Sequence, residues 1–427
     1  MTVLTRRTAL RAMATAAAAG AYPQALLAAM GPADKFDLVI KGAEVLDPSQ
    51  NLRAKRDIGI RFGAVELLAP DIPADKADKV LNAAGRIATP GLIDLHAHVF
   101  PYGSAIGIPA DELIPFQAST TLVSAGDAGA NNIAAFRRYV LPQTRARLFA
   151  FVHIAVHGLA GFPVAELYNI DFAQVDLAAK AIAENADIVL GAKVRMSDNV
   201  IAKHGLEPLR RAILACERSG VPAKVMCHIG GVETAELMSQ ILDTLRAGDI
   251  LTHAFSGVPN IGGKFTNIVQ DGKLLPAALA AKQRGVVFDV GHGGGSFDYT
   301  VAEAAIAQGA GPDVISSDVH VFSANTPGVP YLTNVMSKFL NLGFTLEQVV
   351  AMATAAPAKV INRTAKLGTL QIGAPADISL LELVEGPVEF VDTRANKRSG
   401  RVQIKPAGVV IGGVPYGRPY MAPFATR

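Results

Sequence analysis

The stretch Ile87-Ala88-Thr89-Pro90-Gly91-Leu92-Ile93-Asp94-Leu95-His96-Ala97-His98 decides how the rest of the chain is interpreted. It is an apolar run that ends in two histidines separated by one residue. Successive side chains of an extended strand point to opposite faces, so His96 and His98 project from the same face. Two imidazoles at this spacing suit one metal ion, and imidazole nitrogen is a ligand that zinc favours. The stretch therefore predicts a metal site at the end of a buried strand.

The composition is that of a globular chain with a large core. Of its 427 residues, 50% are hydrophobic and 18% are charged, which indicates one large domain with a smaller companion, or two ordinary domains. The formal net charge is +3, and Arg6, Arg7 and Arg11 account for it, since residues 1–30 contain no acidic side chain. Without these arginines no basic excess remains for nucleic acid or for a membrane surface. We expect a small-molecule substrate as the partner, and a homo-oligomer is compatible with the sequence.

The first residues have the pattern of an export signal. Thr5-Arg6-Arg7-Thr8-Ala9-Leu10-Arg11 precedes an alanine-rich, weakly apolar stretch over residues 12–30. A charged segment followed by an apolar one is typical of secretory signals, and the adjacent arginines are of the twin-arginine type. An ordinary N-terminal helix is the alternative, whereas a stable membrane anchor is not expected because Pro23 interrupts a run too short to span. We predict a twin-arginine signal peptide over residues 1–30, cleaved near Ala29, and a periplasmic or secreted protein.

The two ends of the chain differ from its middle. The region from Phe36 to Ala88 has the pattern of short strands and turns, and the same pattern is found after Leu367. This pattern predicts one small β-sandwich domain, built from residues 31–89 and 367–427. Between them, apolar strands alternate with amphipathic helices, as in a parallel sheet.

The alternating region predicts an α/β fold, a (β/α)8 TIM barrel over residues 90–366. Eight strands are expected, because eight apolar runs alternate with helical segments. Pro208 in the first turn of one helix, and Thr345 with Gln348 as a capping box of another, are ordinary helix start signals. The expected strands end near His98, Ala125, Ile154, Val194, His228, Ala254, Val290 and Val319.

Five further polar residues fall at the strand ends of this barrel, where the chemistry of such barrels takes place. A single strand histidine is most often a satisfied core residue, and a single lysine usually extends to solvent. Several of them at successive strand ends instead indicate a shared site. The five residues are Lys193, His228, His253, His292 and Asp318.

Together these residues resemble the amidohydrolase superfamily. The Pro90–His98 segment, a lysine on strand four, single histidines on strands five and six, and an aspartate on strand eight carry the resemblance, which extends over nearly the whole chain after the leader. Lys193-Val194-Arg195-Met196-Ser197 and Gly291-His292-Gly293-Gly294-Gly295-Ser296-Phe297 are similar to the amidohydrolase/deacetylase metallohydrolase branch, which is dihydroorotase- and D-aminoacylase-like.

The resemblance implies a cofactor of two Zn²⁺ ions per subunit, with zinc as the family expectation. A lysine desolvated inside a barrel loses its proton more readily and can then capture carbon dioxide, which makes an anionic oxygen ligand. The implied ligands are His96, His98 and Asp318 for the more buried ion, His228 and His253 for the more exposed one, and N6-carboxylated Lys193 as the bridge.

The resemblance also implies a hydrolytic mechanism. Two zinc ions that share a water would lower its pKa towards ~7, and the resulting bridging hydroxide would attack a carbonyl carbon. Asp318 would act as general base and then as general acid. His292 would either contact the substrate carbonyl or carboxylate, or only shape its glycine loop. Arg195 lies on the same strand face as Lys193. It is a candidate to bind a substrate carboxylate, or to contact the metal ligands as their partner. Tyr168 is a further substrate-binding candidate.

The implied activity is that of a metal-dependent amidohydrolase or deacetylase, acting on carbon–nitrogen bonds other than peptide bonds and possibly on esters. We expect it to deacylate a small N-acyl amino acid or O-acyl hydroxy acid. Dihydroorotases carry an arginine two residues after the second histidine of the pair, and here that position is Phe100. A hydantoinase- or dihydroorotase-like cyclic amidase is the alternative. A non-catalytic structural or binding homologue is a second one, against which the complete ligand set argues.

Overall fold

The computed structural model describes residues 26, 30–31, 33–362 and 366–416. Most of the expected leader, residues 1–25 and 27–29, lies outside the described residues, so export stays a prediction. Leu26 and Met30 pack against a small apolar cluster that includes Phe36. Among the residues that are described, no helix is both long enough and apolar enough to cross a membrane.

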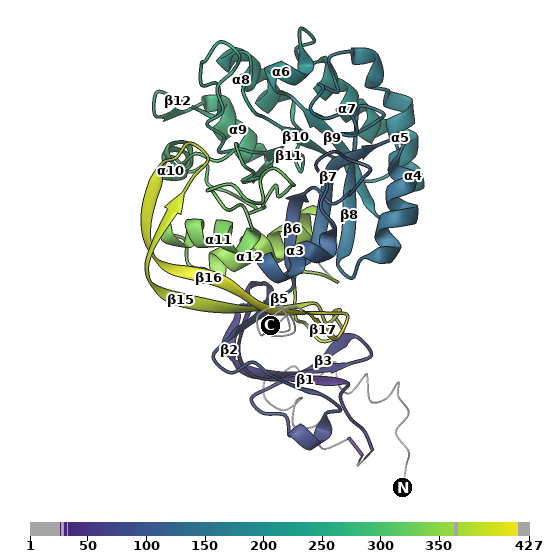
Figure 1. Cartoon of the computed structure of the whole chain (residues 1–427), viewed down its shortest axis with the longest axis vertical. Helices are drawn as coiled ribbons and strands as arrows, with labels where there is room; N and C mark the ends of the chain where they lie inside the picture. The colour runs from purple at the N-terminus through teal and green to yellow at the C-terminus, as the bar shows by residue number, and fades with distance from the viewer. Residues whose placement is uncertain (1–25, 27–29, 32, 363–365, 417–427) are drawn as a thin grey trace.

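The middle of the chain forms the predicted (β/α)8 barrel (Figure 1). Seven parallel strands pair in the order β14-β11-β10-β9-β8-β7-β6, so neighbours in the chain are neighbours in the sheet apart from a small two-stranded insertion. All seven are largely buried, as expected of strands covered on both faces. They are β6 (Leu92–Ala97), β7 (Ser119–Gly129), β8 (Arg147–His153), β9 (Val189–Arg195), β10 (Lys224–His228), β11 (Ile250–Thr252) and β14 (Val287–Asp289).

Residues 314–319 take the place of the eighth strand and close the barrel. They form isolated parallel bridges to β14 at one edge of the sheet and to β6 at the other. The buried carboxylate of Asp94 accepts a hydrogen bond from the backbone N–H of Ser317 at 2.9 Å. The backbone N–H of Asp318 donates to the carbonyl of His96 at 2.6 Å. Closure therefore places Asp318 beside the histidine pair.

The helices lie on the outside of the barrel (Figure 1). The capping box predicted at Thr345 and Gln348 is confirmed, as is Pro208 in the first turn of its helix. A two-stranded insertion, β12 (Val269–Gln270) and β13 (Lys273–Leu274), precedes one of the helices. The helices are α3 (Ala110–Gln117), α4 (Ile133–Ala135), α5 (Val175–Glu184), α6 (Asp198–Ile201), α7 (Glu207–Arg218), α8 (Ala235–Thr244), α9 (Pro276–Arg284), α10 (Tyr299–Ala307), α11 (Leu332–Asn341), α12 (Leu346–Ala353) and α13 (Ala355–Val360).

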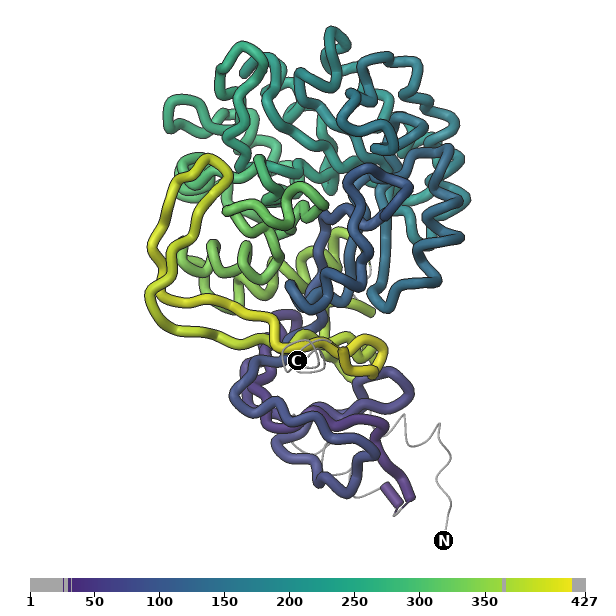
Figure 2. Tube along the Cα trace, in the orientation of Figure 1, coloured from purple at the N-terminus to yellow at the C-terminus, as the bar shows by residue number. Residues whose placement is uncertain are grey.

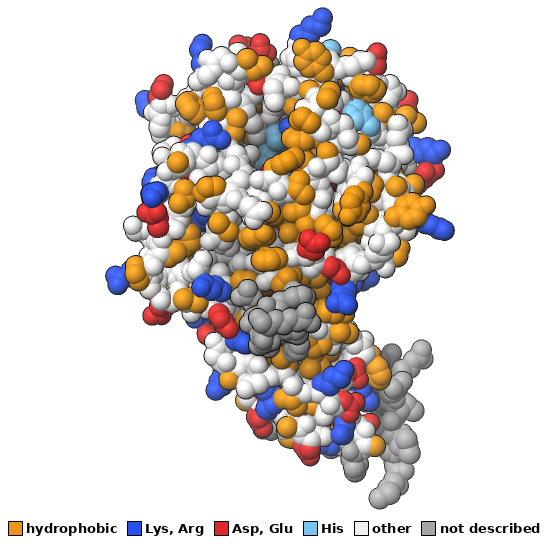
Figure 3. Space-filling view, viewed as in Figure 1, with side chains coloured by type: hydrophobic (Ala, Val, Ile, Leu, Met, Phe, Trp, Pro, Cys, Tyr) orange, Lys and Arg blue, Asp and Glu red, His pale blue; other side chains and the backbone are white. Residues whose placement is uncertain are grey.

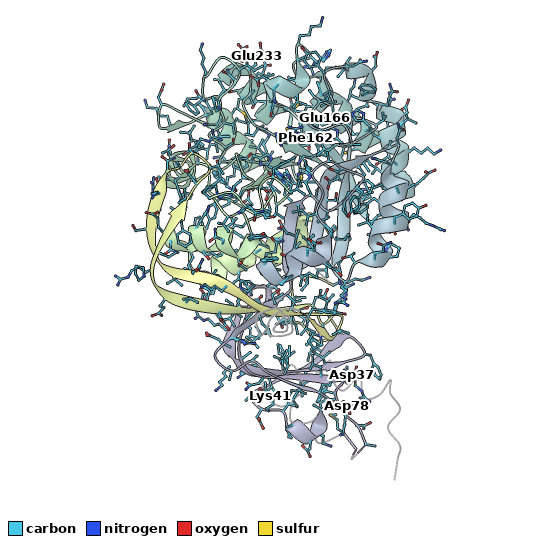
Figure 4. The ribbon with its side chains drawn as sticks, in the orientation of Figure 1. Asp37, Lys41, Asp78, Phe162, Glu166 and Glu233 are labelled. Carbon is cyan, nitrogen blue, oxygen red and sulfur yellow. The ribbon has the colours of Figure 1, made fainter. Side chains whose placement is uncertain are left out.

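The two chain ends form the second sheet, as predicted, and its eight strands are hydrogen-bonded into one continuous sheet. Its core combines residues from both ends, such as Ile40 and Ile378. Lys41, labelled in Figure 4, joins two strands because its Nζ lies 2.6 Å from Asp57 Oδ2. The strands are β1 (Leu38–Asp47), β2 (Leu52–Arg61), β3 (Ala64–Ala69), β4 (Val80–Asn82), β5 (Ile87–Pro90), β15 (Ile378–Val391), β16 (Lys397–Ile411) and β17 (Val414–Tyr416).

Strands β15 and β16 form a long hairpin that leaves the small sheet and runs along the barrel, as the yellow trace in Figure 2 shows. Strand β16 packs against helix α11. At the hairpin turn, the Thr393 hydroxyl accepts a hydrogen bond from the N–H of Phe297 at 3.1 Å and donates to the carbonyl of the same residue at 2.6 Å. The C-terminal part of the chain therefore contacts the loop that follows β14.

Candidate active site

The predicted ligands gather at the carboxyl ends of the barrel strands. Each belongs to a different strand or follows it directly, except the histidine pair, which shares β6. The barrel therefore brings together side chains that are far apart in sequence. The six are His96 and His98 at the end of β6, Lys193 in β9, His228 at the end of β10, His253 after β11, and Asp318 in the closing stretch.

Three of these residues form one compact group of donor atoms. Asp318 Oδ1 lies 3.1 Å from His96 Nε2 and 3.1 Å from His98 Nε2. The three ligand atoms lie within 4.8 Å of one another, and all three residues are buried. Two imidazoles and one carboxylate in this arrangement can hold a single metal ion.

The other predicted ligands adjoin this group. His253 Nε2 lies 2.8 Å from His228 Nδ1, and the centroid of the His253 ring lies 4.9 Å from that of His96. Lys193 Nζ lies 3.2 Å from His96 Nε2. The six side chains thus form one continuous cluster, with a second pair of imidazole donors beside the first three.

In every histidine of the cluster, one ring nitrogen lies within hydrogen-bond distance of a group outside the cluster. Histidines that bind metals use this arrangement, because the outer hydrogen bond fixes the tautomer and the ring orientation. The other ring nitrogens are Nε2 of His96 and of His98, which lie 3.1 Å from Asp318 Oδ1, and Nε2 of His253 and Nδ1 of His228, which lie 2.8 Å from each other. The outer contacts are His96 Nδ1 to Thr252 Oγ1 (2.6 Å), His98 Nδ1 to Asp127 Oδ1 (2.8 Å), His253 Nδ1 to the Gly291 carbonyl (2.6 Å) and His228 Nε2 to Ser197 Oγ (3.2 Å).

Burial determines the protonation of Lys193. Only 1% of the residue is exposed, and burial lowers the pKa of its amino group to about 8, although the Asp318 carboxylate acts in the opposite direction. A neutral amine is the form that reacts with carbon dioxide. Lys193 therefore has the environment that the expected carboxylation requires.

Burial also keeps most of the imidazoles neutral. It lowers the pKa of His96 and His228 well below the ordinary value, and that of His253 to about 4. For His98 burial acts in the same direction, but the carboxylates of Asp127 and Asp318 outweigh it and raise the pKa to about 9. A metal ion would have to displace this proton, so metal binding at His98 is expected to release a proton.

The backbone is strained at two ligands. His253 has φ of 61° and Asp318 has φ of 49°, in the left-handed region that side chains other than glycine seldom adopt. Such strain is found at functional sites, where the surrounding structure holds it. Gly126 adjoins the cluster, and a Cβ at this position would lie 2.5 Å from Lys193 Cγ. A glycine at 126 is therefore needed to make room for the lysine.

Asp127 provides a direct test of metal binding by the cluster. The Asp127→Asn variant loses the charge that orients His98, so we expect metal affinity to fall by roughly 10- to 100-fold. Competition with a chelator, followed by metal analysis of the protein, measures this affinity. Asp176→Asn, a change of the same type at an exposed ion pair, is the control and should leave the affinity unchanged. Unaltered affinity in Asp127→Asn would contradict the role of the Asp127–His98 contact.

A cavity of about 340 Å³ opens onto the cluster. Ile106, Leu159, Phe162 and Phe322 give it apolar walls, and His98, Lys193, His228 and Asp318 line its floor. Figure 3 shows histidine side chains recessed in a hollow of the barrel, among apolar ones. The remaining lining residues are Ala125, Arg195, Gly294, Gly295, Ser296, His320 and Thr326.

Arg195 lines this cavity, as its strand face predicts, but it already has an acidic partner. Glu166 lies in the loop between β8 and α5, and its Oε2 is 3.0 Å from Arg195 Nη1. His153 Nε2 lies 3.2 Å from the other carboxylate oxygen of Glu166. Burial raises the pKa of Glu166, but Arg195 and His153 outweigh it and lower the pKa to about 2. Figure 4 places Glu166 next to Phe162, whose ring lies 5.9 Å from Arg195 Cζ.

Two predicted substrate-binding residues are not brought to the cavity. His292 is fully buried, with Nδ1 2.8 Å from the Gly293 carbonyl and Nε2 2.7 Å from Lys338 Nζ, so neither ring nitrogen is free for a substrate. Of the two roles predicted for His292, this geometry favours shaping the glycine loop over contact with the substrate. Tyr168 is 68% exposed and does not line the cavity. Phe100, at the arginine position of dihydroorotases, packs in the core against Phe136.

Sequence reasoning missed several residues of the site. Asp127 stands near the end of β7, and the rule that polar residues at strand ends form the site could have found it. His320, two residues after Asp318, could have been found in the same way. Glu166 and Phe162 lie in a long loop without a local signal, and only the folded chain shows that they reach the cavity.

The fold and the site together define a β/α barrel with a buried His-His-Asp cluster that could hold a metal ion. The Amidohydrolase family model matches residues 298–418. Deacetylase Atu3266 of Agrobacterium fabrum is 33% identical over 351 residues, which cover 82% of this chain and 84% of that protein. The crystal structure of an adenine deaminase matches with a TM-score of 0.81 at 30% identity, over 90% of this chain and all of that one. The crystal structure of a dihydroorotase matches with a TM-score of 0.79 at 31% identity, and the match covers 89% of this chain and 99% of that one.

The chain belongs to the amidohydrolase superfamily, and it is a hydrolytic enzyme. The names of these similar proteins refer to three different activities, so the family does not by itself select the substrate of this chain.

Proposed function

We propose that this enzyme is a binuclear zinc hydrolase that removes the acyl group from a small N-acyl amino acid or O-acyl hydroxy acid. One observation carries the proposal. Four imidazoles, each hydrogen-bonded at one nitrogen to a group outside the cluster, gather with Asp318 and Lys193 at one cavity: His96 and His98 direct Nε2 towards Asp318, and His253 and His228 lie beside them with Nε2 and Nδ1 facing each other. This donor set matches the ligands that zinc prefers.

The donor set divides between two ions. His96, His98 and Asp318 would hold one, His228 and His253 the other, and carboxylated Lys193 would contribute one oxygen to each. When bound, two zinc ions would supply an activated water as nucleophile and a Lewis acid for the carbonyl oxygen. The buried position of Lys193 supports carboxylation, because the neutral amine is accessible at moderate pH.

Asp318 is the group that we assign to proton transfer. Its Oδ1 contacts the two histidines, whereas its second oxygen, Oδ2, lies 4.0 Å from His253 Nδ1. The histidine pair and His253 overcome the effect of burial and hold the pKa of Asp318 well below its usual range, so the side chain is ionised, which is the form that a general base requires. It would take the proton of the nucleophilic water and deliver it to the leaving amine or alcohol.

The cavity supports an acid with a compact acyl group as the substrate. Arg195 is the cationic side chain of the wall, and only its Nη1 contacts Glu166. The remaining guanidinium N–H groups can bind a substrate carboxylate. Ile106, Leu159 and Phe162 would then cover the apolar part of the substrate. The name of the Agrobacterium fabrum relative supports deacetylation.

Replacing Arg195 tests the carboxylate contact. In Arg195→Met we expect KM for acyl acids to rise by about 10- to 100-fold, because a charge-assisted hydrogen bond is lost. KM for the matching acyl amides, which carry no carboxylate, should change little. Steady-state kinetics on both series measures the difference. Arg211→Met, at a surface ion pair with Glu207, is the control. Equal losses on both series would contradict the assignment.

A substrate panel on metal-quantified protein tests the whole proposal. N-acetyl amino acids and O-acetyl hydroxy acids are compared with hydantoins, dihydropyrimidines and dihydroorotate. Faster opening of the rings would favour the cyclic amidase. The similarity to a dihydroorotase structure supports this alternative. Protein that lacks stoichiometric metal and hydrolyses nothing in the panel would favour a binding or structural role.

We also propose that the enzyme acts outside the cytoplasm, after twin-arginine export. The support is the pair Arg6-Arg7 ahead of an apolar stretch. Cell fractionation of the full chain and of the Arg6→Lys, Arg7→Lys double variant tests the route, and equal export of both would contradict it. Size-exclusion chromatography with light scattering would determine whether the enzyme is a homo-oligomer.

A further inference from the structure

The loop after β14 forms one wall of the cavity, and a buried lysine holds it from behind. Gly294, Gly295 and Ser296 line the cavity. Lys338 of helix α11 is 1% exposed, and its Nζ lies 2.7 Å from His292 Nε2 in the same loop. The His292 ring stacks on the ring of Phe297 with centroids 4.8 Å apart. The lysine therefore contacts the loop but not the cavity.

All three partners of the Lys338 amino group are hydrogen-bond acceptors. Besides His292, the group donates to the carbonyl of Gly328 at 2.7 Å and to the carbonyl of Val391 at 2.8 Å. Burial lowers the pKa of Lys338 to about 7, and the three acceptors match the three N–H groups of its protonated form. Since Nε2 of His292 accepts, its Nδ1 carries the proton and donates to the Gly293 carbonyl. Lys338 thus fixes one tautomer of His292.

The turn of the β15–β16 hairpin holds the same loop from a second side. Thr393 is hydrogen-bonded to both backbone groups of Phe297, and Arg394 Nη2 donates to the carbonyl of Gly295 at 2.8 Å. The Asp392 carboxylate accepts from the N–H of Tyr299 at 2.8 Å. The loop is therefore fixed between α11 and the hairpin.

We propose that Lys338 is a positioning residue of the active site: through His292 it joins the cavity loop Gly291–Ser296 to the turn of the β15–β16 hairpin, and so keeps the loop in the shape that binds the substrate. The lysine does not touch the reacting atoms. Its effect on hydrolysis rests on the proposed function, whereas its effect on His292 and on the loop does not. Lys338→Met removes the three donors, and Lys338→Arg keeps a cation with N–H donors.

A spectroscopic measurement tests the contact without any substrate. In protein labelled with ¹⁵N at its nine histidines, the His292 signals, assigned with His292→Gln, should show the Nδ1–H tautomer in the wild type. In Lys338→Met we expect a mixture of tautomers, together with faster hydrogen exchange at residues 291–297. Lys282→Met, at a lysine paired with Asp313 and outside the cavity, is the control and should alter neither. An unchanged tautomer and unchanged exchange in Lys338→Met would overturn the proposal.

Kinetics then test the consequence for the substrate. If the loop binds substrate and transition state equally, KM should rise about tenfold in Lys338→Met while kcat changes by less than about threefold. Lys338→Arg should restore part of the loss. A fall in kcat and metal content at unchanged KM would show a general structural defect and overturn the positioning role. If no acyl acid is hydrolysed even by the wild type, the proposed function fails, and the spectroscopic result still decides the role of Lys338.

Discussion

Asp318→Asn is expected to lower kcat by roughly 10²- to 10⁴-fold while the protein keeps its fold and much of its metal. Asparagine has the shape of aspartate, and its amide oxygen can still face the two histidine nitrogens that lie 3.1 Å from Asp318 Oδ1. It has no carboxylate to accept the proton of the attacking water. Steady-state kinetics on a zinc-loaded sample, with the metal content of the same sample, measures both effects.

The matched control for this variant is Asp313→Asn. Asp313 forms an ion pair with Lys282 and does not line the cavity, so the same substitution there should leave kcat unchanged. If Asp318→Asn binds metal normally and retains more than about a tenth of the wild-type kcat, Asp318 is not the group that transfers the proton.

The barrel was predictable because its sequence signals are local. Apolar runs, helix caps and the alternation between them depend on neighbouring residues, and the capping box at Thr345 is an example. The closing stretch 314–319 shows the limit of such signals: a strand ending near Val319 was predicted, but the stretch joins β6 and β14 only through isolated bridges and individual backbone hydrogen bonds. The long β15–β16 hairpin was not predicted. Its path along the barrel depends on packing against α11, which no local pattern encodes.

The ligand cluster was predictable for a related reason. The six predicted ligands lie at or near strand ends, and a closed barrel places all strand ends at one rim, so strand position indicated where they gather. The resemblance to the amidohydrolase superfamily indicated their roles. The substrate side of the site was not predictable, because it is built from loops. His292 follows a strand end as the predicted ligands do, but its ring is buried and contacts Lys338 of α11. Glu166 reaches Arg195 from a loop 29 residues earlier in the chain.

Lys193→Ala is expected to have the second large effect, a loss of metal and of activity together. The side chain lies at the centre of the cluster, and its Nζ is 3.2 Å from His96 Nε2. Without it, no oxygen would bridge the two donor groups. We expect about one metal ion per chain or fewer instead of about two, and a fall in kcat/KM of at least ~10³-fold, since a water without a bound metal ion has a pKa of ~15.7 rather than ~7. Metal analysis and kinetics on the same sample measure this.

The effect of losing the carboxylation can be distinguished from the effect of losing the lysine side chain. Lys193→Arg keeps a cation that does not deprotonate and so does not capture carbon dioxide. It should be as inactive as Lys193→Ala, because the neutral amine is what burial provides at this position. Wild-type apoprotein reconstituted with zinc should regain more activity with bicarbonate than in buffer freed of carbon dioxide, and ¹³C-bicarbonate should give a carbamate signal that both variants lack. Lys224→Ala, at a half-buried lysine at the opposite end of β10, should behave as the wild type. Full activity of Lys193→Arg, or reconstitution that does not depend on bicarbonate, would reject the bridging carbamate.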